Sequence, residues 1–185
     1  MYETLYENQL GRVWVRPKEM FFEDVEINGV KKPRFEKIKF RFQASETLSE
    51  KEITSIHDLY RICFNKELNQ DKFQSKLKFH SQGFFLTCFE GDKLIGFKLG
   101  YAQDKDLFYS WHGAVLPDYQ SLGVASELMN LQHEWCQKNG FKKIETRTRN
   151  HFLNMIRLNL KFGFKIIGTQ SSAVDDIKIV LEKLL

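Results

Sequence analysis

The most constraining feature of the sequence is a strand, a proline-broken turn and a helix that follow one another between residues 107 and 140. Residues 107–115 form an aromatic and apolar run that is typical of a buried strand. Pro117 ends this run, because proline cannot donate a hydrogen bond to a sheet ladder. After Gly123 the apolar spacing becomes that of a helix, which Asn139-Gly140 ends with a left-handed cap. The junction therefore places a glycine-containing turn at the start of an amphipathic helix.

The turn itself, Gln120-Ser121-Leu122-Gly123-Val124-Ala125, can bind an anion through its backbone. The first amides of a helix have no intrahelical acceptor, and the helix dipole adds partial positive charge at the same place. Such a junction is suited to a phosphate or a pyrophosphate. Gly123 lets the backbone approach the anion without an intervening Cβ, and Ala125 is the next smallest residue. A string of this kind alone is more often a simple turn, but its flanking strand and helix favour a binding site.

The rest of the chain alternates between strand-like and helix-like periodicity. Val25-Glu26-Ile27 and Val30 around Asn28-Gly29 predict a β-hairpin. Ser49 and Glu52 form a capping box that begins a helix. Further helices are predicted at 71–79 and 150–162, and further strands at 38–42, 84–89, 94–101, 144–148, 164–168 and 177–181. This order indicates an α+β fold with α/β layers and an extra N-terminal hairpin.

Composition excludes several classes of protein. The formal net charge of +4 is small and its basic residues are scattered, which argues against a nucleic-acid-binding protein. No apolar stretch is long enough to span a membrane, and the residues after Met1 do not form a secretory signal. Cys63, Cys88 and Cys136 are far apart and odd in number. They predict reduced thiols in a cytoplasmic protein rather than a metal site.

The turn resembles the acetyl-CoA loop of the GNAT superfamily of N-acetyltransferases, whose motif is (Gln/Arg)-x-x-Gly-x-(Gly/Ala). The preceding residues 115–119 resemble the usual lead-in, and residues 158–164 resemble a second signature, a helix ending in Gly-Phe before a strand. The element order from about residue 34 is similar to that of the family. The resemblance implies a GNAT-like domain at residues 34–185, with a central mixed, mostly antiparallel sheet flanked by helices. Residues 1–33 are left as an N-terminal extension.

The resemblance also implies that acetyl-CoA is the co-substrate and that no metal takes part. Backbone groups of Ala114 and Val115 are expected to bond the pantetheine arm. The pyrophosphate is expected to lie against Gln120, Ser121, Leu122, Gly123, Val124, Ala125 and Ser126. An asparagine near the start of the helix at 150–162 is expected to contact the cofactor. Asn150 fits if that helix is slightly longer than usual, and Asn154 is the alternative.

The catalytic groups depart from the family pattern. Many relatives have a tyrosine four residues before the helix-ending glycine, placed to protonate the departing thiolate. This chain has Asn159 there, which can donate a hydrogen bond to the sulfur or cofactor but cannot act as an acid. Strict alternation predicts that Tyr109 and Trp111 share the sheet face of Gly113 and that His112 points to the other side. Tyr109 is therefore the candidate for ordering a catalytic water, and His112 is interpreted as a packed histidine.

The predicted reaction is direct attack of a primary amine on acetyl-CoA, with backbone amides stabilising the oxyanion. The candidate acceptor-binding residues are Tyr60, Phe64 and Trp111, whose aromatic rings suit an acceptor with some apolar surface but equally suit core packing. The amine belongs to a small molecule or a peptide. Two alternatives stay open: an acyl-CoA-binding or regulatory module with little catalysis, suggested by Asn159, and a homodimer.

Overall fold

The structure of the protein is a computed structural model that describes residues 2–3, 13–14, 19, 22–27, 29–33, 39–79, 82–171 and 177–185. The chain divides into two compact units, Met1–Lys39 and Phe40–Leu185. The predicted domain boundary between residues 33 and 34 adjoins residues 34–38, which lie outside the described residues, so that boundary stays a prediction. The two units are taken separately below.

The first unit contains two short antiparallel strand pairs. Strands β1 (Tyr2–Glu3) and β2 (Val13–Trp14) form one pair. Strands β3 (Asp24–Ile27) and β4 (Val30–Pro33) form the other, with Ile27 opposite Val30. Gly29 has a φ of 77°, the left-handed conformation that a two-residue hairpin turn requires, while Asn28 lies outside the described residues. The predicted N-terminal hairpin is therefore confirmed.

The second unit has the predicted order of elements. Its strands are β5 (Arg41–Ser45), β6 (Gly83–Glu90), β7 (Lys93–Ala102), β8 (Leu107–Val115), β9 (Lys143–Arg149), β10 (Lys165–Ser171) and β11 (Ile177–Leu184). Its helices are α1 (Glu50–Phe64), α2 (Gln70–Phe79), α3 (Val124–Lys138) and α4 (Leu153–Lys161). Helix α4 begins three residues later than predicted, because Phe152 has a non-helical ψ of 64° and no side chain caps the helix there.

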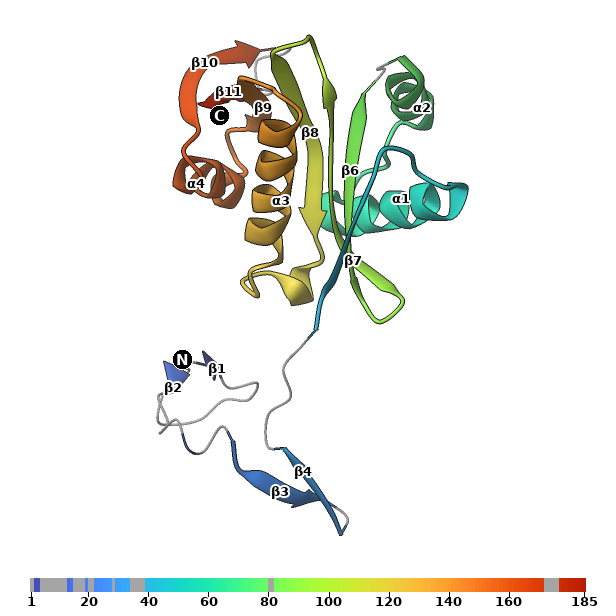
Figure 1. Cartoon of the computed structure of the whole chain (residues 1–185), viewed down its shortest axis with the longest axis vertical. Coiled ribbons are helices and arrows are strands. Elements are labelled where there is room, and N and C mark those ends of the chain that lie inside the picture. The colour runs from blue at the N-terminus through green and yellow to red at the C-terminus, as the bar shows by residue number, and fades with distance from the viewer. Residues whose placement is uncertain are drawn as a thin grey trace. The chain divides into compact units, whose positions relative to one another are not determined.

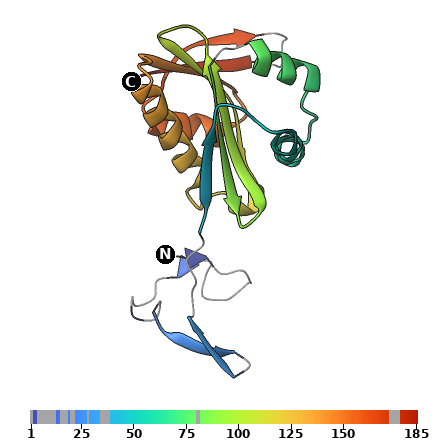
Figure 2. The same cartoon turned by 45° about the vertical axis from the view of Figure 1, so that its right-hand side comes forward.

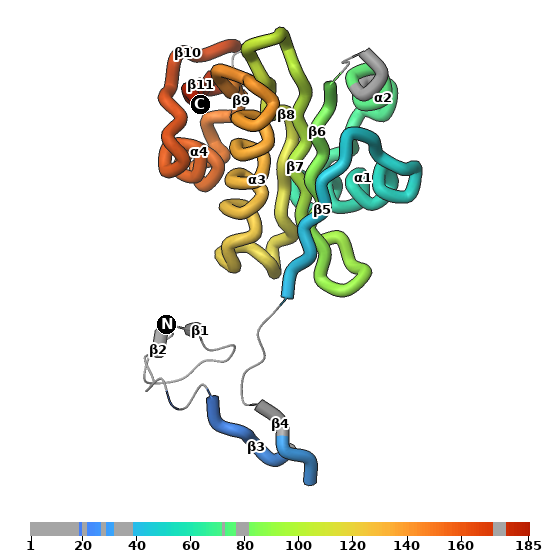
Figure 3. The backbone as a smooth tube through the Cα atoms, in the orientation of Figure 1, coloured from blue at the N-terminus to red at the C-terminus, as the bar shows by residue number. Residues whose placement is uncertain are grey.

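The strands of this unit form one mixed sheet in the order β10-β11-β9-β8-β7-β6-β5. Neighbouring strands are antiparallel except β8 and β9, which run parallel. Strands β5 and β10 therefore lie at opposite edges of the sheet (Figure 3). The prediction of a mixed, mostly antiparallel sheet is confirmed, and its single parallel pair lies near the centre.

Helices cover both faces of the sheet (Figures 1 and 2). Helices α3 and α4 lie on one face, and α1 and α2 lie on the other. Ser49 and Glu52 form the predicted capping box at the start of α1, which buries Ile56 and Leu59 against the sheet. Helix α3 packs on the other face of the sheet, where it buries Val124 and Leu128 among others. The junction between β8 and α3 thus lies at one end of a packed, two-sided sheet.

Candidate active site

The turn between β8 and α3 presents an uncapped helix N-terminus. Pro117–Tyr119 form one 3₁₀ turn, and Ser121 and Gly123 then adopt left-handed conformations with φ of 65° and 87°. No side chain caps α3, which begins directly after Gly123. The first-turn amides of α3 are therefore left to an outside acceptor. A Cβ on Gly123 would meet no protein atom within 4 Å, so the protein requires glycine here for its positive φ.

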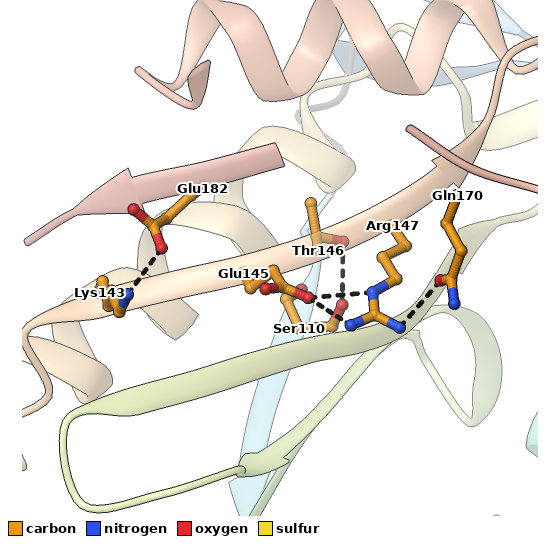
Figure 4. Close-up of polar contacts among 7 residues, drawn as sticks. All are labelled: Ser110, Lys143, Glu145, Thr146, Arg147, Gln170 and Glu182. Carbon is orange, nitrogen blue, oxygen red and sulfur yellow. Dashed lines mark hydrogen bonds and ion pairs between the residues drawn. The ribbon is translucent and has the colours of Figure 1, made fainter. Parts of the chain in front are cut away.

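The strands β8 and β9 separate beside this turn. Their parallel pairing covers Leu107–Ser110 and Lys143–Thr146 and goes no further, although both strands continue. At the last pair Thr146 Oγ1 donates to the backbone oxygen of Ser110 at 2.9 Å (Figure 4). Beyond this pair, the part of β8 that leads to Val115 has its backbone free of β9. Such an opening between parallel strands leaves peptide groups available to a ligand.

The backbone of Val115 points into this opening. The amide of Leu116 donates to the Ile95 oxygen, so that Val115 and Gly96 form a non-hydrogen-bonded pair. The carbonyl of Val115 accordingly faces away from β7 and accepts from Gln120 Nε2 at 3.3 Å and from Cys63 Sγ at 3.4 Å. By the same alternation the peptide groups of Gly113 face the opening.

A β-bulge in β8 overturns the predicted arrangement of its side chains. Leu99 pairs with His112, but Gly100 pairs with Ser110, which leaves Trp111 as an extra residue. Alternation therefore fails at this point, and the rings of Trp111 and His112 lie side by side with their centroids 4.4 Å apart. The prediction that His112 points to the opposite face from Trp111 is wrong.

A cavity of about 590 Å³ lies on the α1 and α2 side of this bulge. Its apolar side includes Tyr60, Phe73, Trp111 and His112. Trp111 stacks on Phe73 at 5.3 Å, and Tyr60 meets His112 edge-on at 5.5 Å. The rest of its lining comes from the α1–α2 connection and α2: Lys66, Glu67, Leu68, Asn69, Asp71, Ser75 and Lys76. The cavity is therefore an aromatic pocket with a charged rim and one imidazole in its wall.

Two of the predicted acceptor or catalytic residues lie beside this cavity rather than in its lining. Phe64 packs on Tyr60 and on Phe152, with centroid distances of 4.5 and 5.7 Å. Tyr109 precedes the bulge and packs between Tyr101 and the guanidinium of Arg147. Burial raises the pKa of Tyr109 to about 12 despite the opposing effect of Arg147, so that its phenol stays protonated.

Burial determines the protonation state of His112. Burial disfavours the imidazolium and lowers the pKa of His112 to about 4. The ring is therefore neutral through the neutral pH range, with a nitrogen able to accept a proton. Sequence reasoning missed this residue because the bulge that turns it into the cavity depends on the pairing with β7. The glycine at position 100, opposite the aromatic run, is the one local signal of that bulge.

Gly100 is predicted to be essential to the bulge. A Cβ at this position would clash with the ring of Phe108 and lie 2.8 Å from the backbone oxygen of Tyr109. Gly100→Ala is therefore expected to destabilise the protein by about 1 to 3 kcal/mol through overpacking. Denaturant unfolding measures this change, with Gly168→Ala as the control, because a Cβ on Gly168 meets no atom within 4 Å. Equal losses in the two variants would contradict the clash at Gly100.

The three candidate asparagines occupy different environments. Asn150 lies in the turn before α4 and is exposed, since α4 does not extend back to it as that prediction required. Asn154 is exposed in the first turn of α4. Asn159 is 2% exposed, and its Nδ2 has no hydrogen-bond partner in the described part of the protein. Asn159 alone therefore presents a buried, unpartnered donor.

Glu145 and Arg147, two residues apart on β9, form an ion pair. Arg147 Nη2 lies 2.9 Å from Glu145 Oε1, and Arg147 Nη1 donates to Gln170 Oε1 at 3.1 Å. Figure 4 shows this network joining β9 to β10. Their charges are satisfied by each other and leave no free group for catalysis.

The cysteines are all free thiols, with Cys88 and Cys136 buried and Cys63 half-buried. Among the described residues no group of His, Cys, Asp and Glu side chains is arranged to hold a metal ion. Within the same residues, no helix is both long and apolar enough to cross a membrane.

The fold is thus a two-sided mixed sheet whose parallel strands separate beside an uncapped helix N-terminus. Residues 53–164 match the family model described as Acetyltransferase (GNAT) family, and this chain belongs to that family. It is accordingly an acetyl-CoA-dependent N-acetyltransferase. Residues 1–37 match a second family model, described as a protein of unknown function (DUF1653). A comparison with curated protein sequences gives no match.

Solved structures share the fold at low sequence identity. The ribosomal-protein-S18-alanine N-acetyltransferase of Escherichia coli is 15% identical with a TM-score of 0.68, over 78% of this chain and 94% of that one. A GNAT acetyltransferase of Elizabethkingia anophelis with acetyl-CoA bound is 16% identical with a TM-score of 0.63, over 80% and 100%. Arabidopsis thaliana Naa50, in complex with the bisubstrate analogue CoA-Ac-MVNAL, is 18% identical with a TM-score of 0.63, over 77% and 97%.

Proposed function

We propose that the protein transfers the acetyl group of acetyl-CoA to a primary amine by direct attack. The observation that carries this proposal is the adjacency of two sites around β8. The uncapped α3 N-terminus and the opened backbone of Val115 suit a cofactor, and the aromatic cavity across the sheet suits an acceptor. The reacting atoms then meet at the bulge, where the imidazole of His112 lies in the cavity wall.

The pyrophosphate of the cofactor would bind the residues from Gln120 to Ser126 through their backbone amides. The pantetheine arm would run along the opening between β8 and β9. There it would bond the backbone N–H of Val115 and the peptide groups of Gly113, whereas Ala114 faces its partner Phe97 on β7. Asn154 and Asn159 of α4 would be the candidate cofactor contacts, and Asn150 is the weaker candidate because it precedes the helix.

The acceptor amine would enter from the α1 and α2 side, between Tyr60 and Trp111. An amine arrives mostly as an ammonium ion and must lose a proton before it attacks. Desolvation lowers the pKa of His112. It would also lower the pKa of an ammonium ion bound in the same cavity, so burial weakens the donor's hold on its proton as well as the basicity of the imidazole. His112, and not Tyr109, is therefore our candidate for the general base.

The chemistry of the neighbours supports an amine on a peptide or a small molecule. The Naa50 complex joins CoA to a peptide through the acetyl group, and the Elizabethkingia structure holds acetyl-CoA. The alternative, an acyl-CoA-binding module with little catalysis, is favoured by Asn159, because an amide cannot protonate the departing thiolate.

Two measurements on the whole protein test the proposal. Isothermal titration with acetyl-CoA is expected to show binding, and absence of binding at millimolar cofactor would overturn the proposal. A screen of peptide N-termini and small primary amines, read by release of free thiol, is expected to find turnover. Binding of acetyl-CoA without turnover on any amine would favour the binding module instead.

A further inference from the structure

The turn before α3 contains two left-handed residues within three positions, Ser121 and Gly123. Glycine adopts this conformation freely, but the Cβ of Ser121 crowds its own backbone there. The amide of Tyr119 donates to the carbonyl of Leu116, which is a bond within the turn itself. A turn with a strained residue and local bonds of this kind depends on contacts with other elements for a fixed position.

Tyr119 joins this turn to the hairpin between β6 and β7. Its hydroxyl donates to Oε2 of Glu90, the last residue of β6, at 2.5 Å. Tyr119 and Glu90 are 29 positions apart in the chain, so this bond connects separate elements. Glu90 is in turn paired with Lys93 across the two-residue turn of the hairpin. Figures 1 and 2 show this hairpin and the turn before α3 at the same end of the sheet.

The ring of Tyr119 has two further contacts. Phe40, which precedes β5, meets it edge-on with the ring centroids 6.3 Å apart. Nζ of Lys93, the first residue of β7, lies 5.1 Å from the ring centroid, a distance at which a cation is attracted to an aromatic face. Tyr119 is accordingly half-buried, with its hydroxyl and its ring both engaged by other elements.

The bond to Glu90 is of the strong, charge-assisted type. A carboxylate that accepts from a hydroxyl forms a shorter and stronger hydrogen bond than a neutral acceptor does. The same bond raises the pKa of Tyr119 above its ordinary value of 10.0, so the phenol stays protonated across the neutral pH range. Tyr119 therefore remains a donor to Glu90 under the conditions in which the protein would act.

Gln120 gives the turn a second attachment. Its Nε2 donates at 3.3 Å to the carbonyl of Val115, which lies at the end of β8. Two consecutive residues thus tie the turn to two different parts of the sheet, the β6–β7 hairpin and the end of β8. Both attachments come directly before the left-handed Ser121, where the chain changes direction into α3.

We propose that the hydrogen bond between Tyr119 and Glu90 positions the pyrophosphate loop before acetyl-CoA binds. This inference rests on the proposed function. Tyr119 and Glu90 are positioning residues that act through the turn, whose following amides would bind the pyrophosphate. A turn that is already held in place does not have to be ordered by the cofactor, and this increases affinity. Loss of the bond is therefore expected to weaken cofactor binding and to leave the chemical step unchanged.

The first test compares the affinity for acetyl-CoA with the rate of reaction. Tyr119→Phe removes the hydroxyl and keeps the ring, and its Kd for acetyl-CoA is expected to rise about 10-fold in isothermal titration. With the best amine from the acceptor screen, the KM for acetyl-CoA is expected to rise while kcat at saturation stays unchanged. Glu90→Ala is expected to match Tyr119→Phe, whereas Glu90→Gln keeps an acceptor oxygen and is expected to bind more tightly than either.

Asp92→Asn is the matched control for these variants. It also converts a carboxylate to an amide on the β6–β7 hairpin, but at an exposed residue of the turn. Its Kd for acetyl-CoA is expected to equal that of the unaltered protein. The double variant Tyr119→Phe with Glu90→Ala is expected to bind as each single variant does, because both changes remove the same bond.

The second test is amide hydrogen exchange without cofactor, which does not depend on activity. In Tyr119→Phe the amides of residues 119–124 are expected to exchange faster than in the unaltered protein, while those of the central strands keep their rates. Saturation with acetyl-CoA is expected to remove the difference. Faster exchange throughout the sheet would instead assign Tyr119 a general structural role and overturn the proposal.

The outcomes separate the two proposals. Failure of the unaltered protein to bind acetyl-CoA contradicts the proposed function. Binding by the unaltered protein with the same Kd in Tyr119→Phe overturns the positioning role of Tyr119, as do additive losses in the double variant. If Tyr119→Phe does not fold, Glu90→Ala carries the same test from the other partner, and an unchanged Kd in that variant also overturns the proposal.

Discussion

Replacement of His112 by glutamine is expected to lower kcat about 1,000-fold, within the range that general base catalysis contributes. Glutamine keeps a planar polar group of similar size in the cavity wall but cannot take up a proton. Because His112 lies on the acceptor side of β8, the KM for acetyl-CoA is expected to stay unchanged. Steady-state kinetics with the best amine from the acceptor screen provides the measurement.

His151→Gln is the matched control, since His151 is an exposed histidine beside α4. Its kcat is expected to equal that of the unaltered protein. A kcat for His112→Gln within about threefold of the control would remove His112 from the reaction and leave a water as the base.

The burial of His112 has a separate signature in stability. Its pKa is about 4 in the folded protein, below the ordinary value of 6.5, because burial disfavours the charged ring. Between these two values the unfolded chain binds more protons at this position than the folded chain does. The free energy of unfolding is therefore expected to fall as pH decreases from about 6.5 to about 4, and to fall less steeply in His112→Gln. Parallel pH dependences in the two proteins would show that His112 is not buried as a neutral ring.

The order of elements could be predicted because each depends on residues that are close in sequence. The capping box of Ser49 and Glu52, the proline at 117 and the left-handed glycine at 123 act within one or two turns of chain. The acetyl-CoA loop belongs to the same class of feature, since a helix N-terminus is defined by its own amides. Features that involve only neighbouring residues were therefore enough to predict the order of elements and the proposed cofactor loop.

The acceptor side could not be predicted from β8 alone. Alternation along an isolated strand gives His112 the opposite face from Trp111. In the sheet, β7 pairs Leu99 with His112 and Gly100 with Ser110, and the inserted residue turns both rings into one cavity. A one-residue change in register reverses every facing assignment beyond it.

Introduction of a carboxylate at Leu122 is expected to weaken acetyl-CoA binding about 100-fold, which corresponds to about 3 kcal/mol. Leu122 is 47% exposed in the turn that leads into α3, so a polar side chain there costs little packing. In Leu122→Asp the carboxylate would occupy the field of the α3 N-terminus and repel the pyrophosphate. Because an acidic residue near a helix N-terminus is favourable, thermal stability is expected to be unchanged or slightly raised. Loss of affinity without loss of stability separates this effect from misfolding.

Leu122→Asn is the matched control, because asparagine has the shape of aspartate without its charge. Isothermal titration with acetyl-CoA is expected to give this variant nearly the affinity of the unaltered protein. The difference between the aspartate and asparagine variants is expected to shrink as salt is raised, since mobile ions screen charges separated by about 10 Å at 0.1 M ionic strength. Equal affinities of the two variants at low salt would mean that the pyrophosphate binds away from this turn, and would contradict the assignment of Gln120 to Ser126 as the cofactor loop.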